Sequence, residues 1–291
     1  MARIAIVTRT KDRTEMLRRC VKSVSAQAFG DYVQVIVNDG GSREDVENVV
    51  AGESDAARRK IVVVLNAAPT GRWPPANIGV RAVDSELVTL LDDDDTLDPT
   101  FLARMTAAYD ARRYANTGGV ACRTRIINEK IADAGLQYLG EREFNPDFTE
   151  ALLFVLAAKN KFTVNAFLYA RSCYDALGGY RDDLPVLGDW DFNIRFLLQF
   201  DIEVVPATLA NWHIRAELGG TQSITSEASR HASITNQLRN ALLRADVNAG
   251  RVGLGYINAV SLAIKMQRAD YLRTTRILGP FNKAMSFLRS W

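Results

Sequence analysis

The sequence has few of the residues that mark disulfide-stabilised, zinc-binding or membrane-spanning proteins. Its 291 residues include only three cysteines, Cys20, Cys122 and Cys173, which lie far apart. This spacing offers neither a Cys-x-x-Cys metal site nor an even disulfide framework, so a reducing compartment, the cytoplasm, is expected. No run reaches the roughly 18 apolar residues that a membrane span needs. The first apolar run, Ile4 to Val7, is too short for a signal peptide.

Net charge is also nearly absent, because 36 Lys and Arg balance 34 Asp and Glu. The whole-chain balance therefore predicts no nucleic-acid partner. Residues 227–291 nevertheless carry ten basic and three acidic side chains. Near the end, Phe281, Ala284, Met285 and Leu288 follow helical spacing, which predicts a basic amphipathic helix. It could contact the inner face of a membrane, form a homo-oligomer, pack on a following domain, or cover the core of this chain.

Four short runs rich in β-branched residues predict buried strands at residues 4–7, 33–37, 61–65 and 87–91. Helical spacing lies between them, as at Leu17, Cys20, Val21 and Val24. Alternating strands and helices predict an α/β fold, a mostly parallel central sheet flanked by helices, with ligands at the carboxyl ends of the strands. Further along, the pattern predicts a strand at 120–127, a helix at 149–158, and a turn at Gly178-Gly179 before the stretch 187–200.

Four consecutive carboxylates, Asp92, Asp93, Asp94 and Asp95, follow the fourth predicted strand. Two unit charges about 4 Å apart repel by ~4 kcal/mol at an effective dielectric near 20, so such a run needs a counter-charge. A divalent cation with oxygen ligands, Mn²⁺ or Mg²⁺, would supply it. The alternative is a solvated turn in which Asp98 caps a helix that begins at Pro99.

The second predicted strand ends in Asn38-Asp39-Gly40-Gly41-Ser42. Glycines there let the backbone approach a flat ligand closely, and Asp39 could accept a hydrogen bond from a nucleobase N–H. The alternative is an Asx-turn in which Asp39 bonds its own backbone.

These segments resemble the inverting nucleotide-diphospho-sugar transferases of glycosyltransferase family 2, which have the GT-A Rossmann-like fold. Over the first 110 residues the resemblance rests on five segments: Thr8-Arg9-Thr10-Lys11-Asp12-Arg13, Ser23 to Gln27, Asn38 to Ser42, Gly71 to Gly79, and Asp92 to Pro99. It covers roughly residues 1 to 215 and is strongest over the first 110. Two departures from the family pattern are Asn38 in place of an aspartate and Pro75-Ala76 in place of Ala-Arg.

The resemblance implies a set of nucleotide-binding and metal-binding residues. Nucleotide contacts are implied for Thr8, Arg9, Asp12, Asp39, Arg72, Asn77, Asp92 and Asp93. Metal contacts are implied for Asp94, Asp92 and His213, with Asp94 as the direct ligand. The segment Gly188-Asp189-Trp190-Asp191 matches the family's catalytic position, so Asp189 is the expected base and Asp191 its competitor. Because residues two apart on a helix do not share a face, only one of the two should point into the site.

The resemblance therefore implies metal-dependent transfer of a sugar from a nucleotide-diphosphate donor to a hydroxyl of a glycan or lipid-linked acceptor, with inversion, in surface polysaccharide synthesis. Residues 1–225 are the expected transferase domain, with a nucleotide-binding half at 1–110 and an acceptor-binding half at 111–225. Residues 226–291 are expected to form a basic helical C-terminal extension. Two alternatives stay open, a sugar-nucleotide nucleotidyltransferase and an inactive sugar- or nucleotide-binding scaffold. The segment after the first strand contains no glycine, which argues against the first.

Overall fold

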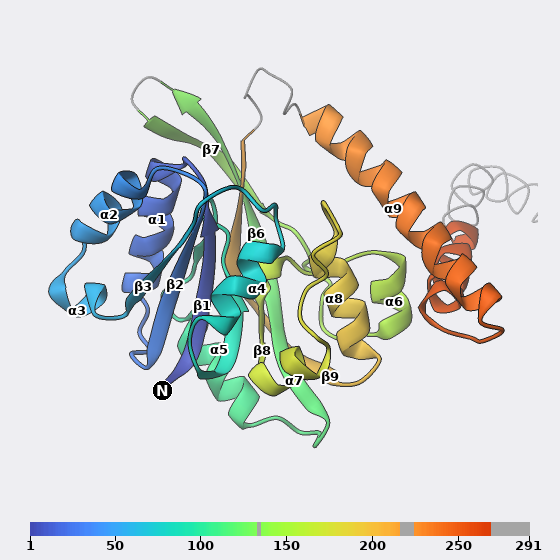
Figure 1. Ribbon diagram of the computed structural model, residues 1–291. Helices are drawn as coiled ribbons and strands as arrows, with labels where there is room; N and C mark the ends of the chain where they lie inside the picture. The colour runs from blue at the N-terminus through green and yellow to red at the C-terminus, as the bar shows by residue number, and fades with distance from the viewer. Residues whose placement is uncertain (133–134, 216–223, 269–291) are drawn as a thin grey trace, which may run out of the picture. The chain divides into compact units, whose positions relative to one another are not determined.

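The computed structural model describes residues 1–132, 135–215 and 224–268 and has an α/β fold built on one curled sheet (Figure 1). In the described part of the chain the sheet has nine strands, in the order β3-β2-β1-β4-β8-β6-β9-β5, with β7 paired to β6. The strands are β1 (Ala2–Thr10), β2 (Tyr32–Asp39), β3 (Ile61–Asn66), β4 (Ser85–Leu90), β5 (Thr96–Leu97), β6 (Thr117–Ala132), β7 (Gly135–Glu143), β8 (Phe167–Ala170) and β9 (Asp201–Arg215). The helices are α1 (Thr14–Ser25), α2 (Arg43–Ala51), α3 (Asp55–Arg58), α4 (Pro74–Arg81), α5 (Phe101–Asp110), α6 (Leu153–Ala158), α7 (Arg171–Ala176), α8 (Gly188–Leu197) and α9 (Ile224–Asn248), with a short 3₁₀ turn at Val164–Ala166.

The first half of the sheet is parallel and covered on both faces. Strands β3, β2, β1 and β4 pair in parallel, and the four predicted strands are confirmed. Ile36 packs with Leu17 of α1 and Val46 of α2 on one face. The next residue, Val37, points to the other face, where a Cβ at Gly79 of α4 would come within 3.0 Å of it. Consecutive strand residues thus pack against helices on opposite faces of the sheet. This is why these strands are apolar throughout.

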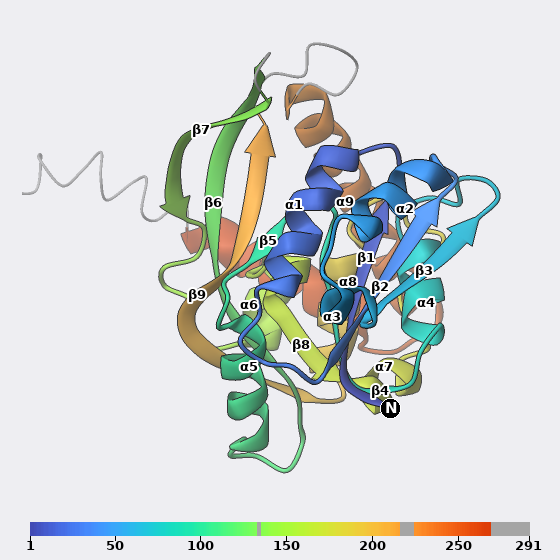
Figure 2. The same cartoon turned by 90° about the vertical axis from the view of Figure 1, so that its left-hand side faces the viewer.

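The second half of the sheet mixes directions. Strand β8 is antiparallel to both β4 and β6, whereas β6 and β9 run parallel. The long strand β6 turns back into β7, and this hairpin projects beyond the rest of the sheet beside α1, as Figures 1 and 2 show. The β6–β9 pairing aligns Glu129 with Arg215 and Ile127 with His213, which carries these side chains toward the end of the acidic run.

Two predicted helix starts are wrong. Helix α5 begins at Phe101 rather than Pro99, because Asp98 still donates its backbone N–H to Leu209 of β9 and thus continues the extended β5 segment. The Asp98 carboxylate instead accepts from the amide and hydroxyl of Thr100. Helix α6 begins at Leu153, four residues later than the predicted start at Thr149.

The chain divides into two compact units. The first comprises Met1–Leu153 and Asn160–Ala232, and the second Phe154–Lys159 and Ser233–Trp291. The predicted boundary at residue 225 falls within α9. Within the second unit, Asn258 donates to the carbonyl of Ala157, and Asp246 accepts from the amides of Gly253 and Tyr256. The predicted amphipathic helix at 281–289 lies outside the described residues.

A search of the described helices for a membrane span finds none with sufficient length and hydropathy.

Candidate active site

The carboxyl ends of β1, β2 and β4 bring the predicted motifs together at one edge of the sheet. Thr10 at the end of β1 pairs with Asn38 in β2, and Val7 of β1 pairs with Leu90 of β4, directly before the acidic run Asp92–Asp95. Ligands of open parallel sheets gather at this edge.

The four carboxylates of the acidic run alternate between the surface and the interior. Asp92 and Asp94 remain partly exposed, whereas Asp93 and Asp95 are buried. The exposed pair can therefore contact a ligand directly, and the buried pair must find partners inside the protein.

Arginines supply the counter-charge of the exposed pair. Arg9 forms an ion pair with Asp92 through two of its nitrogens, one of them Nε at 3.0 Å. Asp94 accepts from Arg13 at 2.9 Å and from Arg215 at 2.5 Å. Burial acts to raise the pKa of Asp92, but the charges of Arg9 and Arg72 outweigh it and lower that pKa.

The buried pair is stabilised by hydrogen bonds. Thr10 donates its hydroxyl to Asp93 at 2.8 Å, and the backbone amide of His213 donates to Asp95 at 3.0 Å. Burial raises the pKa of Asp93 to about 7, with Arg13 opposing the shift and Asp94 adding to it. Burial and the charges of Asp94 and Asp92 raise the pKa of Asp95 well above its ordinary value.

Glu129, a buried carboxylate from β6, is linked through its arginine partners to the acidic run and to β9. It accepts from Arg19 at 2.6 Å and Arg215 at 3.0 Å, and it pairs with Nδ1 of His213 at 3.1 Å. The Nε2 of His213 hydrogen-bonds Thr96 at 2.9 Å, and burial lowers the pKa of the imidazole. Both ring nitrogens thus have protein partners, and His213 would have to release Thr96 to ligate a metal.

Asn38, not Asp39, makes the turn that follows β2. Asn38 accepts from the amide of Gly41 and donates to the carbonyls of Gly41 and Ser42, which is the Asx-turn considered for its neighbour. Asp39 is left to point toward the loop before α4.

The Asp39 carboxylate accepts several hydrogen bonds, most of them from that loop. It accepts from the side chain of Asn66, the amide and hydroxyl of Thr70, and the amide of Gly71. Burial acts to raise the pKa of Asp39, but these hydrogen bonds outweigh it and lower the pKa. The carboxylate is therefore ionised and oriented.

Steric crowding explains why residue 41, the second of the Gly40-Gly41 pair, is a glycine. A Cβ on Gly41 would lie 2.7 Å from the carboxylate of Asp12, which accepts the backbone amide of Ser42. Asp12 itself has a positive φ of 52°. Thr8 is fully buried and accepts from Gln34, so its hydroxyl faces the core rather than the surface.

Arg9 and Trp73 connect the acidic run to helix α8. The Arg9 guanidinium lies over the Trp73 ring at 4.9 Å, and Trp73 stacks on Tyr180 at 5.2 Å. Arg9 also donates to the backbone carbonyl of Arg72. Gly188 at the start of α8 lies against the indole, since a Cβ there would come within 2.6 Å of the indole nitrogen.

Asn77 is fully hydrogen-bonded inside the protein. Its amide nitrogen donates to the Tyr180 carbonyl and to Asp182, and its oxygen accepts from the Tyr174 hydroxyl and the Tyr180 amide. These four bonds use the whole capacity of the amide. Asn77 therefore has none left for a phosphate in this structure.

The two carboxylates of α8 have different environments. Asp191 is buried and bonded to Arg195 at 2.8 Å, and Arg195 in turn donates to the carbonyls of Leu177 and Gly179. Asp189 is half-buried and accepts from Asn160 at 2.9 Å. Asp191 is thus committed to an internal ion pair.

The electrostatic neighbours of Asp189 belong to the site. Burial raises its pKa, the backbone amide of Trp190 and the charge of Arg72 oppose this, and Asp92 adds to it. A carboxylate whose pKa is raised in this way is a candidate for a general base.

The donor set fits a divalent cation that takes few protein ligands. Among the residues that the structure describes, no three His, Cys, Asp or Glu side chains are grouped for a metal. Mg²⁺ is commonly held by one or two carboxylates and completes its shell with waters and substrate phosphates. Asp92 and Asp94, both partly exposed oxygen donors, meet that requirement.

The depression beside Asp12, one of the predicted nucleotide-binding residues, is small. A depression bounded by Thr10, Asp12, Arg13 and Ser42 has a volume of only about 10 Å³. A cavity of about 580 Å³ lies elsewhere, between α1 and the β6–β7 hairpin.

Four residues that contact the acidic run or its neighbours were not predicted as site residues: Arg13, Arg19, Glu129 and Arg215. Arg13 and Arg215 lie in the segments that contain Asp12 and His213. The two-residue period of a strand also places Arg215 on the same face as His213, so this signal was available. No pattern pointed to Glu129.

The chain resembles known proteins over most of its length. The model of glycosyl transferase family 2 matches residues 5–171, more than half of the chain. An uncharacterised glycosyltransferase of Bacillus subtilis, YwdF, is 23% identical over 231 residues, covering 78% of this chain and 80% of that protein. A PGL/p-HBAD biosynthesis glycosyltransferase of Mycobacterium bovis is 26% identical over 194 residues, covering 66% and 68%.

Solved structures support the fold at low identity. TarS of S. aureus, in complex with UDP-GlcNAc, gives a TM-score of 0.59 at 14% identity and covers 74% of this chain. The chain spans about 59% of that TarS fragment. The mannosyltransferase PcManGT of Pyrobaculum calidifontis, in complex with GDP-Man and Mn²⁺, gives a TM-score of 0.59 at 15% identity, covering all of this chain and 81% of that one. The expected GT-A fold is confirmed.

Proposed function

The chain belongs to glycosyl transferase family 2, and from this premise we propose that it transfers a sugar from a nucleoside diphosphate to a hydroxyl of a glycan or lipid-linked acceptor. The observation that carries the proposal is the environment of Asp189. This half-buried carboxylate has a raised pKa, and its electrostatic neighbours are Arg72, Asp92 and Arg9. These neighbours support Asp189 as the base, because they include residues proposed to hold the donor.

We place the nucleoside beside Asp39 and Asp12. We place the diphosphate beside Arg9, Arg72 and Arg13, because the charges of these three arginines act on Asp92 of the acidic run. Asp94 and Asp92 would hold Mn²⁺ or Mg²⁺. When bound, the cation would stabilise the charge of the departing diphosphate. In our proposal, Thr8, Asp93 and Asn77 position neighbouring groups, since each side chain is buried and bonded within the protein.

Asp189 is the proposed base. It takes the proton of the acceptor hydroxyl as that oxygen forms a bond to the anomeric carbon, while the bond from this carbon to the diphosphate oxygen breaks. Attack from the face opposite the leaving group inverts the anomeric configuration. Asn160 orients the Asp189 carboxylate, and the Asp191–Arg195 pair fixes α8, on which Asp189 lies.

The names of relatives support the acceptor class. One relative, from Campylobacter jejuni, is a GalNAc(5)-diNAcBac-PP-undecaprenol β-1,3-glucosyltransferase and is 33% identical over 100 residues, covering 31% of that protein. An O-antigen biosynthesis protein of Myxococcus xanthus is 32% identical over 111 residues, covering 8% of that protein. We therefore favour surface polysaccharide or lipid-linked glycan synthesis, in the cytoplasm, to which three free buried cysteines are suited.

Thermal-shift and calorimetric binding of UDP, GDP, dTDP and CDP, each with and without Mn²⁺, test the proposal. We expect one diphosphate to bind with metal and Asp94→Ala to abolish that binding. Asp98→Ala is the matched control, because among the described residues the Asp98 side chain bonds only Thr100. It should bind as the wild type does.

If no diphosphate binds with any metal, the transferase proposal is wrong and the scaffold alternative replaces it. If a nucleoside triphosphate and a sugar phosphate bind in preference to the diphosphates, the nucleotidyltransferase alternative replaces it.

A further inference from the structure

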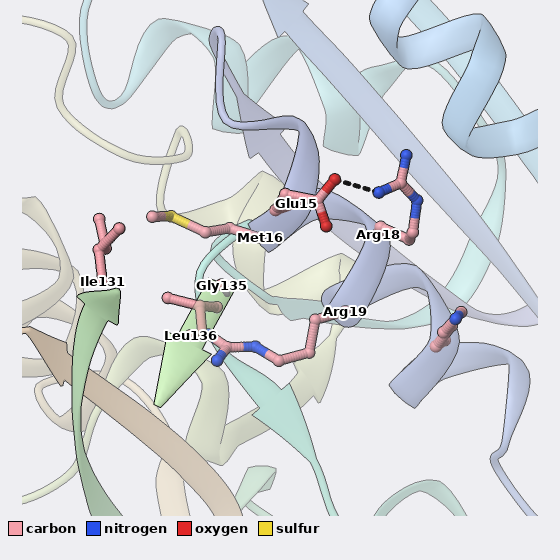
Figure 3. A pocket seen from close by; sticks show the side chains of 8 residues that line it. Glu15, Met16, Arg18, Arg19, Ile131, Gly135 and Leu136 are labelled. Carbon is pink, nitrogen blue, oxygen red and sulfur yellow. Dashed lines mark hydrogen bonds and ion pairs between the residues drawn. The ribbon is translucent and has the colours of Figure 1, made fainter. Parts of the chain in front are cut away.

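A second site lies between α1 and the β6–β7 hairpin. The cavity there has a volume of about 580 Å³, within the roughly 300–1,000 Å³ of small-molecule pockets. Figure 3 shows Met16 and Arg19 of α1 extending toward the strand ends that carry Ile131 and Leu136. None of the residues assigned to donor binding or catalysis lines it.

One wall of the cavity is a charged stripe of α1. Glu15, Arg18, Arg19 and Lys22 lie at i, i+3, i+4 and i+7, so they share one helix face. Arg18 is paired with Glu15. The ammonium group of Lys22 forms no hydrogen bond or ion pair with another described residue. The stripe therefore offers positive charge to a ligand.

The opposite wall is apolar. Ile131 of β6 is paired with Leu136 of β7, and Met16 extends from α1 toward them (Figure 3). Tyr138 lies on the same strand face as Leu136. The exposed fractions of Ile131 and Tyr138 are 45% and 60%. An apolar chain that enters the cavity would thus find a continuing apolar surface on the hairpin.

Arg19 connects this cavity with the acidic run. Its guanidinium donates to Glu129 at 2.6 Å and to the backbone carbonyl of Asp94 at 2.5 Å. An anion at the Arg19 side of the cavity is therefore only one side chain away from the proposed metal ligand.

We propose that the cavity binds the lipid-phosphate part of the acceptor. The phosphate lies at Lys22 and Arg19, and the hydrocarbon chain lies along Met16, Leu136 and Ile131. A cationic wall facing an apolar wall is complementary to a ligand with an anionic head and an apolar tail, and a free sugar would use neither the apolar wall nor the charge. The identification of this ligand as the acceptor rests on the proposed function. The binding of a lipid phosphate in the cavity does not depend on it.

Binding of farnesyl phosphate to the full chain by calorimetry tests the proposal, with farnesol and inorganic phosphate as the two half-ligands. We expect farnesyl phosphate to bind at least about tenfold more tightly than either half. Lys22→Glu and Leu136→Asp should each weaken its binding by about tenfold or more. The matched controls Arg43→Glu and Leu65→Asp change exposed residues of α2 and β3 and should bind as the wild type does.

Equal binding of farnesyl phosphate by wild type, Lys22→Glu and Leu136→Asp would overturn the proposal. It is also overturned if phosphatidylglycerol vesicles retain the chain while dissolved farnesyl phosphate does not bind, because the surface would then contact a bilayer. All four variants should keep the metal-dependent diphosphate binding of the wild type. If farnesyl phosphate binds and no diphosphate does, the site stands and the proposed function fails.

Discussion

Gly188 and Trp73 lie in direct contact, and this contact leaves no room for a side chain at residue 188. A Cβ on Gly188 would come within 2.6 Å of three indole atoms. Trp73 is 2% exposed and is stacked on Tyr180, so the buried ring has neighbours that resist its displacement. The contact sets the position of the first turn of α8, which carries Asp189.

Gly188→Ala should therefore displace α8 and reduce both stability and turnover. Overpacking of this kind typically costs about 1–3 kcal/mol of unfolding free energy, measurable by urea denaturation. The matched control is Gly52→Ala, where a Cβ would meet ordinary contacts of 3.4 Å and φ is −71°. It should be neutral or slightly stabilising. Equal effects of the two substitutions would show that the indole does not restrict residue 188.

Asp39→Asn should lower stability in a pH-dependent way. Burial opposes ionisation of Asp39, but its hydrogen bonds outweigh burial and lower the pKa. The carboxylate therefore stabilises the fold at pH above its unfolded pKa of about 3.9, and this contribution is lost as pH falls through the folded pKa. Urea unfolding should show the variant about 1 kcal/mol less stable near neutral pH. The difference should shrink as the pH falls through the folded pKa of Asp39, and a difference that stays constant with pH would show that the ionised carboxylate is not its source.

The nucleotide-binding half of the fold could be predicted because its strands are apolar on both faces. Ile36 and Val37 are buried by different helix layers, and that requirement is visible as an uninterrupted apolar run. The apolar runs also showed where each strand ends. Asp39 and the acidic run both follow such ends, so they could be predicted to lie at the same edge of the sheet.

The partners of the acidic run were not predicted, because they depend on strand pairing across long sequence distances. Glu129 and Arg215 meet only because β6 and β9 are parallel neighbours, and no local pattern specifies that pairing. The metal was inferred from uncompensated charge at Asp92–Asp95. In this structure Arg9, Arg13 and Arg215 provide compensation, so the metal remains a prediction that rests on the two exposed carboxylates.

Arg215→Gln should test whether Arg215 and a bound metal ion compete for the Asp94 carboxylate. The substitution removes ion pairs to Asp94 and Glu129, and loss of one partner of a buried pair costs about 3 kcal/mol. Mn²⁺ should stabilise this variant against heat more than it stabilises the wild type, because Asp94 has lost a competing cation. If Mn²⁺ stabilises both proteins equally, Arg215 does not compete with the metal for Asp94.

Asn77→Ala should separate positioning from phosphate binding. The change leaves the Tyr174 hydroxyl, the Tyr180 amide and Asp182 without their Asn77 partner, and an unsatisfied buried group costs about 1–3 kcal/mol. We expect lower stability by urea denaturation and unchanged diphosphate affinity in the folded protein. Weaker diphosphate binding at wild-type stability would instead assign Asn77 to the phosphates.

Asp189 is the proposed base of a metal-dependent sugar transferase. The most direct measurement is release of nucleoside diphosphate from the sugar nucleotide in Mn²⁺, compared in wild type, Asp189→Asn and Asp191→Asn, with diphosphate affinity measured on the same samples. The account predicts that Asp189→Asn loses roughly 10²–10⁴-fold in turnover and keeps its diphosphate affinity, while Asp191→Asn loses mainly stability. Wild-type turnover by Asp189→Asn, or a folded Asp191→Asn that binds diphosphate and does not turn over, would contradict it.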